Sequence, residues 1–103
     1  MLIEFNTDKN IEGGQKLADY FTKTLQEDLD RYDDMITRLV VHLGDENASK
    51  KGENDKRCLL EARIKNAQPV AVTEFADTIQ KAVKGATDKL TVVLEKTSQK
   101  KHM

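Results

Sequence analysis

The first segment whose side chains could do chemistry is the polar stretch DENASKKGENDK, residues 45–56. It begins like a calcium-binding loop, because its first, third and fifth residues carry side-chain oxygens. A helix-loop-helix calcium site also needs glycine at the sixth position and a bidentate glutamate at the twelfth. Lys50 and Lys56 occupy those two positions, and strand-like segments flank the stretch. We therefore interpret it as a hairpin loop whose lysines, Lys50 and Lys51, form a basic tip that could reach a nucleic acid.

Nucleophilic catalysis would require the single cysteine, Cys58. Sequence alternation places Cys58 on the inward face of a strand, where a cysteine is normally a small inert hydrophobic residue. A catalytic thiol also needs a histidine partner, but His42 is predicted on the opposite face of a neighbouring strand. No three histidine, cysteine or carboxylate side chains have the spacing of a zinc site. We therefore predict no enzyme, no metal site and no cofactor.

The lysines of the last helical segment indicate a different chemistry. Lys89, Lys96 and Lys100 follow one another at helical spacing and form a row roughly 16 Å long on one flank. Such a row suits successive backbone phosphates of a nucleic acid. Lys81 and Lys84 lie toward the solvent side of the same segment. The alternative is that these lysines only complement the helix dipole and keep the surface soluble, and the pattern favours neither interpretation.

Composition limits the kind of protein that can position these residues. The chain has 103 residues, 38% apolar and 34% charged, which predicts one domain over residues 1–103. The net charge of −1 means that any basic surface must come from segregation of charge. The opening residues do not resemble a signal peptide, and no segment has the roughly 20 apolar residues of a membrane span. We expect a cytoplasmic protein that does not act at a membrane.

Hydrophobic periodicity predicts six elements. The strand-like segments alternate apolar and polar residues, and the helical segments carry apolar residues three and four positions apart. In chain order we predict strand 2–6, helix 14–32, strands 36–43, 56–65 and 69–73, and a helix from about 74 to 97. The one helical crossover allows the first two strands to be parallel, and Pro69 favours an edge position for the last strand.

The predicted fold is α+β, a β-α-β-β-β-α order that forms a four-stranded mixed sheet. Both helices carry a single apolar stripe, so both should pack on one face of the sheet. The other face is then open to solvent and rich in basic residues, which are Arg38, Arg57, Arg63 and Lys65. Val40 and Leu59 share this open face. An alternative function is therefore a small protein-protein interaction module that uses them as its centre.

Three segments, together with the element order, resemble one protein family. These segments are residues 41–47, 54–63 and 76–90. They resemble the ribosome hibernation promoting factors, also called ribosome-associated inhibitor A or sigma-54 modulation proteins. The resemblance implies a non-enzymatic translation factor with no small-molecule substrate. Such a factor binds the small ribosomal subunit in the mRNA and tRNA channel, contacts its ribosomal RNA and silences ribosomes under stress.

The resemblance also implies which residues contact RNA. The RNA-facing lysines of the family's second helix match Lys89, Lys96 and Lys100, and Lys23 lies near a basic family position on the first helix. Val92 stands where the family carries an arginine. The chain ends soon after the second helix, as in the short form of the family. The predicted ribosomal RNA-binding residues are Lys23, Arg38, Arg57, Arg63, Lys65, Lys81, Lys84, Lys89, Lys96 and Lys100.

Overall fold

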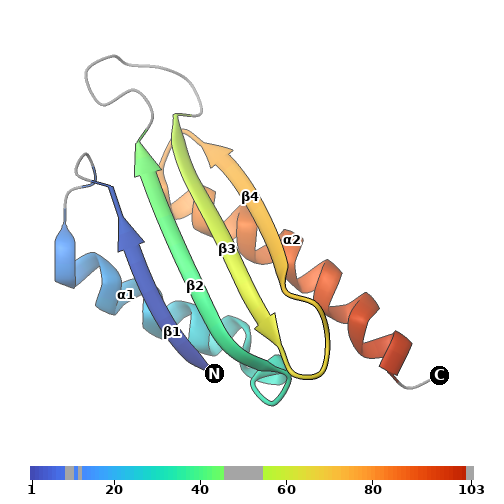
Figure 1. The fold of residues 1–103 in the computed structure, drawn as a ribbon. Helices are drawn as coiled ribbons and strands as arrows, with labels where there is room; N and C mark the ends of the chain where they lie inside the picture. The colour runs from blue at the N-terminus through green and yellow to red at the C-terminus, as the bar shows by residue number, and fades with distance from the viewer. Residues whose placement is uncertain (9–10, 12, 46–54, 102–103) are drawn as a thin grey trace.

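The computed structural model describes residues 1–8, 11, 13–45 and 55–101, with the side chains of residues 99–101 left out. The predicted loop residues from 46 to 54, Lys50 and Lys51 among them, lie outside this described part. The elements are β1 (Leu2–Thr7), α1 (Gly14–Asp28), the 3₁₀ turn η1 (Asp30–Tyr32), β2 (Ile36–Asp45), β3 (Lys56–Ile64), β4 (Val70–Ala76) and α2 (Ile79–Lys101) (Figure 1). The predicted β-α-β-β-β-α order is confirmed.

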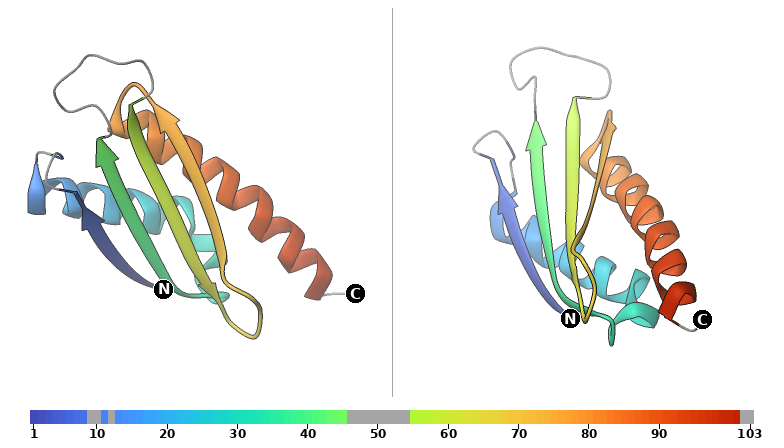
Figure 2. Two further views of the ribbon diagram at one scale, coloured as in Figure 1. Left: turned by 45° about the horizontal axis from the view of Figure 1, so that its top comes forward. Right: turned by 45° about the vertical axis from the view of Figure 1, so that its right-hand side comes forward.

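The four strands form one mixed sheet in the order β1-β2-β3-β4. β1 is parallel to β2, and the two later pairs are antiparallel. Both helices cover the same face of this sheet, with α1 behind β1 and β2 and α2 behind β3 and β4 (Figures 1 and 2). β4 is an edge strand, as Pro69 predicted.

The core lies between the sheet and the two helices. Burial of aliphatic side chains along alternate positions of the central strands drives this packing. The fully buried large side chains are Leu25, Leu29, Ile36, Leu39, Val41, Leu43, Cys58, Leu60, Leu90 and Leu94. The remaining positions of each strand, including Arg38 and Arg63, point to the open face, as the alternation predicted.

The predicted first helix is interrupted after Asp28. Leu29 leaves the helical conformation, with φ −107° and ψ 13°, and the backbone N–H of Tyr32 donates to the Leu29 carbonyl at 2.9 Å. The chain therefore tightens into η1, and it still buries Leu29 and Tyr32. The apolar spacing predicted their burial correctly, but the prediction of one continuous helix to Tyr32 was wrong.

The second helix begins later than predicted, at Ile79. Phe75 belongs to β4, where its register partner is Arg57 on β3, and its side chain is 48% exposed. The prediction that Phe75 is part of the helix stripe was therefore wrong. Thr78 caps the true start, because its Oγ1 accepts a hydrogen bond from the backbone N–H of Lys81 at 3.1 Å.

Candidate nucleic-acid interface

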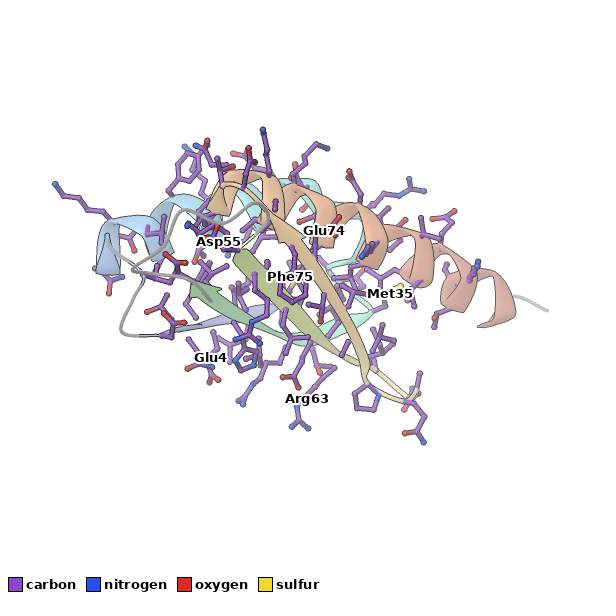
Figure 3. All side chains as sticks on the ribbon, turned by 90° about the horizontal axis from the view of Figure 1, so that it is seen from above. Glu4, Met35, Asp55, Arg63, Glu74 and Phe75 are labelled. Carbon is purple, nitrogen blue, oxygen red and sulfur yellow. The ribbon has the colours of Figure 1, made fainter. Side chains whose placement is uncertain are left out.

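Two arginines lie opposite each other at one end of the open sheet face. Arg38 at the start of β2 and Arg63 near the end of β3 are cross-strand partners, and both are exposed. Figure 3 shows Arg63 and Glu4 on the side of the sheet that faces away from the helices. Among the described residues, neither arginine has an ion-pair partner. Like charges directly opposite destabilise a sheet, so this pair is suited to an external anion.

Arg57 occupies the other end of the same face and has different surroundings. A Cβ atom at Gly44 would lie 2.9 Å from Nη2 of Arg57 and 3.1 Å from Oδ2 of Asp8. The guanidinium and the carboxylate therefore both lie over the bare Gly44 backbone. Asp8 also accepts a hydrogen bond from the backbone N–H of Asp45 at 3.1 Å. Arg57 is thus part of an acidic neighbourhood that joins β1, β2 and β3.

Lys65 lies just beyond the end of β3, one residue outside the observed strand, whereas the sequence predicts it inside the strand. β3 ends at Ile64, and Lys65 lies in the turn that follows, where its backbone N–H donates to the Met35 carbonyl at 2.8 Å. Asn66 adopts a positive φ of 60° in this turn. The placement of Lys65 within the strand was therefore wrong by one residue, because the chain reverses toward β4 at this point.

Three of the predicted α2 lysines pair with carboxylates. Lys81 lies 3.1 Å from Asp77, and Lys84 lies 3.3 Å from Asp88. The ammonium group of Lys89 reaches β4, where it donates to the Thr73 carbonyl at 2.8 Å and to Glu74 at 3.3 Å. Exposed ion pairs are worth about 0 to 1 kcal/mol each, so a phosphate can compete with these carboxylates at small cost.

Lys96 is the freest cation of the α2 row that the structure describes. It is exposed and, within residues 1–8, 11, 13–45 and 55–98, has no ion-pair partner. It borders a groove of about 470 Å³ whose other wall is η1, with Arg31 and Tyr32. Lys100 lies in the described helix backbone, but its side chain lies outside the description. Lys23 is exposed on α1 and also lacks a carboxylate partner among the described residues.

No sequence pattern predicted the contact that joins η1 to α2. The buried Tyr32 donates its phenolic hydrogen bond to Glu95, and Arg31 lies over the Tyr32 ring at 5.2 Å. The hydrogen bond to Glu95, together with burial, raises the pKa of Tyr32 above its ordinary value of 10.0. The carboxylate of Glu95, the residue before Lys96, therefore contacts Tyr32 and Arg31.

The two residues considered for nucleophilic catalysis lie on opposite faces, as predicted. Cys58 is fully buried, and burial raises the pKa of its thiol to about 12. His42 lies on the open face, with Nε2 2.8 Å from Oε1 of Glu61. Among the described residues, no group of three histidine, cysteine, aspartate or glutamate side chains could hold a metal ion. The described helices include none long and apolar enough to cross a membrane.

The model of one protein family, described as sigma 54 modulation protein / S30EA ribosomal protein, matches residues 6–102. The chain belongs to this family. Sigma 54 modulation and S30EA proteins are ribosome-associated, so this protein is a ribosome-associated factor, and the resemblance found in the sequence is confirmed. A search of curated proteins found no match.

Solved structures share the fold. One is the N-terminal domain of Protein Y from Thermus thermophilus, with 24% identity and a TM-score of 0.74, which covers 94% of this chain and 99% of that one. Another is a ribosomal subunit interface protein from Coxiella burnetii, with 16% identity and a TM-score of 0.64, over 96% of this chain and 99% of that one. At these identities the likeness concerns the fold, and it agrees with the membership of the S30EA family.

Proposed function

We propose that this protein is a non-enzymatic translation regulator of the cytoplasm. It binds the small ribosomal subunit in the mRNA and tRNA channel, contacts ribosomal RNA there, and promotes ribosome hibernation under stress. Membership of the S30EA family supports the ribosome as the partner. The observation that carries the RNA contact is the exposed pair of Arg38 and Arg63, which brings two like charges together with no carboxylate partner among the described residues.

The charge distribution supports binding to the RNA backbone. A net charge of −1 gives no general attraction to a polyanion, so affinity must come from local contacts with phosphates. Arg38 and Arg63 lie at the end of the sheet toward which the C-terminal half of α2, with Lys96, extends (Figure 1). Side chains that carry charge but make no base-specific contacts read the shape and phosphates of folded RNA and not its sequence.

Co-sedimentation with purified small ribosomal subunits over a salt series tests this proposal. We expect the retained fraction to fall steeply as salt rises, because each phosphate contact releases counterions. Lys96→Gln and Arg63→Gln should each weaken retention and flatten the salt dependence by roughly one contact. Asn6→Asp, an exposed change on β1 with the same charge difference, is the matched control and should behave as the wild type.

The same experiment can also contradict the proposed function. Retention that does not depend on salt and survives both substitutions would contradict binding through phosphates. It would favour a protein partner on the open face, which Val40, Leu59 and the exposed Phe75 share.

A further inference from the structure

The solvent face of α1 carries an exposed tyrosine between two lysines. Lys16, Tyr20 and Lys23 follow at intervals of four and three residues, so they lie in a line along one face of the helix. The line spans about two turns, roughly 10 Å. Tyr20 is 56% exposed, and both lysines are also exposed. Neither lysine pairs with a carboxylate in the described part of the chain.

The ring of Tyr20 is held in place from below. The buried Phe21 meets it edge to face, with centroids 5.0 Å apart and ring planes at 77°. This contact limits the freedom of the Tyr20 side chain before any ligand arrives, so less entropy is lost on binding. An exposed aromatic ring held in this way can stack with a flat group of a ligand.

A groove opens beside the ring. It has a volume of about 470 Å³ and lies between α1, which contributes Lys16, Leu17 and Tyr20, and the first turn of α2, which contributes Thr78 and Ile79. Its wall is apolar where Leu17 and Ile79 pack against the core. A flat apolar group that stacks on Tyr20 can therefore extend its edge into this groove.

Charge decides which kind of group fits. Positive charges at both ends of a stacking platform match a ligand whose flat ring lies between two anionic groups, which is the chemistry of a single-stranded nucleic acid. Asp19, three residues after Lys16 and four before Lys23, accepts a hydrogen bond from Gln15 at 2.8 Å. Glu27 follows Lys23 by one turn but forms no ion pair with it within the described chain.

We propose that this α1 face is a stacking site for an unpaired base of RNA. The base stacks on Tyr20 at the mouth of the groove, and Lys16 and Lys23 contact the phosphates on either side. The inference rests on the proposed function for the choice of RNA as ligand, and it adds Lys16 and Tyr20 to the predicted contact Lys23. It also distinguishes an unpaired strand from the duplex regions of ribosomal RNA.

Tyrosine fluorescence reports this contact directly. The chain has two tyrosines and no tryptophan, and Tyr32 is only 4% exposed. Titration with a ten-nucleotide oligouridylate should quench the emission of Tyr20 as the base stacks. Tyr20→Phe should keep the affinity, because the ring remains, whereas Tyr20→Leu should bind roughly 5- to 100-fold more weakly. Since Tyr20 is exposed, circular dichroism should show both variants folded.

The lysines are tested by salt dependence in the same titration. Lys16→Gln and Lys23→Gln should each reduce the slope of log affinity against log salt by about 0.7, the value for one phosphate contact on a single strand. Asn6→Asp, with the same charge difference on the open face of β1, should leave the slope unchanged. Equal affinity of Tyr20→Leu and the wild type, or saturation without quenching, would overturn the stacking site.

Sedimentation with small subunits separates this inference from the proposed function. If wild-type protein does not sediment with subunits, the proposed function fails, whereas quenching by oligouridylate would still support the α1 site. If wild type and Tyr20→Leu sediment equally and bind the oligonucleotide equally, only the α1 site fails. Loss of sedimentation in Tyr20→Leu without any oligonucleotide binding would mark a protein contact and would also overturn the site.

Discussion

The two ends of the sheet differ in how their charged side chains are paired. At the end where β2 finishes and β3 begins, Lys56 lies 3.2 Å from Asp45 and 3.1 Å from Asp55. Arg57 and Asp8 both lie over Gly44 at the same end. At the other end, where β2 begins and β3 finishes, Arg38 faces Arg63. Opposite charges therefore lie together at the first end, and like charges lie together at the second.

Burial explains the difference. Asp55 is only 6% exposed, and a carboxylate removed from water must be paired or hydrogen-bonded. Arg38 and Arg63 remain in water and tolerate each other at small cost. The near-zero net charge of the chain therefore conceals two separate uses of charge. One set of groups holds the strands together, and the other is available to a partner.

Gly44→Ala should break the paired end and have the largest effect on stability. The added methyl group would lie 2.9 Å from Nη2 of Arg57 and 3.1 Å from Oδ2 of Asp8, so both groups must move. Both contacts are with the ends of side chains that can shift, so we expect the free energy of unfolding to fall by about 1 kcal/mol, measured by urea denaturation. A double variant that adds Arg57→Ala should show non-additive loss, because it removes one of the two clashing groups. Full additivity would mean that the clash is not the cause.

Alkaline pH should lower the free energy of unfolding, because the folded protein buries the thiol of Cys58. Burial holds the pKa of Cys58 at about 12, whereas the unfolded thiol has the ordinary value of 9.0. Between these values the folded state keeps a proton that the unfolded state loses, so stability falls by about 1 kcal/mol per pH unit as pH rises. Urea denaturation from pH 8 to pH 10.5 should show this decline, and Cys58→Val should make it shallower.

The decline should not disappear completely in Cys58→Val. The hydrogen bond to Asp55 raises the pKa of Lys56, and the hydrogen bond to Glu95 raises the pKa of Tyr32. Both contributions are present below the ordinary pKa of each group and are lost as pH rises through the raised value. An unchanged slope in Cys58→Val would show that the thiol is not the group that titrates.

Arg63→Glu, at the end where Arg38 faces Arg63, should have a smaller effect on stability and of opposite sign. The change replaces a like-charged cross-strand pair with an attractive pair of Arg38 and glutamate, so the free energy of unfolding should rise by about 0.5 kcal/mol. The same change should weaken retention on small subunits, since it removes a phosphate contact. A protein that becomes both more stable and equally retained would show that this end does not serve RNA.

Local sequence predicted the fold because each element is defined by its own periodicity. Alternation along β2 and β3 placed Arg38 and Cys58 on the correct faces. The start of α2 was missed because the apolar spacing of Phe75 fits both a helix and a strand. The signal that could have corrected it was Thr78, a residue suited to capping a helix.

The surroundings of the candidate site could not be predicted in the same way. Tyr32 and Glu95 are 63 residues apart, and Lys89 reaches back 16 residues to Thr73, so no local pattern shows either contact. Spacing shows which face of a helix a lysine occupies. It does not show whether a carboxylate of another element already lies beside it, and this determines which cations are free for a ligand.

The hydrogen bond from Lys89 to the Thr73 carbonyl also bears on solubility. Thr73 lies in β4, an edge strand, and edge strands offer backbone groups with which another chain can pair and aggregate. The ammonium group of Lys89 occupies the Thr73 carbonyl of this strand, and Pro69, which precedes the strand, has no N–H to offer. A modification that neutralised Lys89 would therefore leave the strand less protected against self-association, whatever it did to binding.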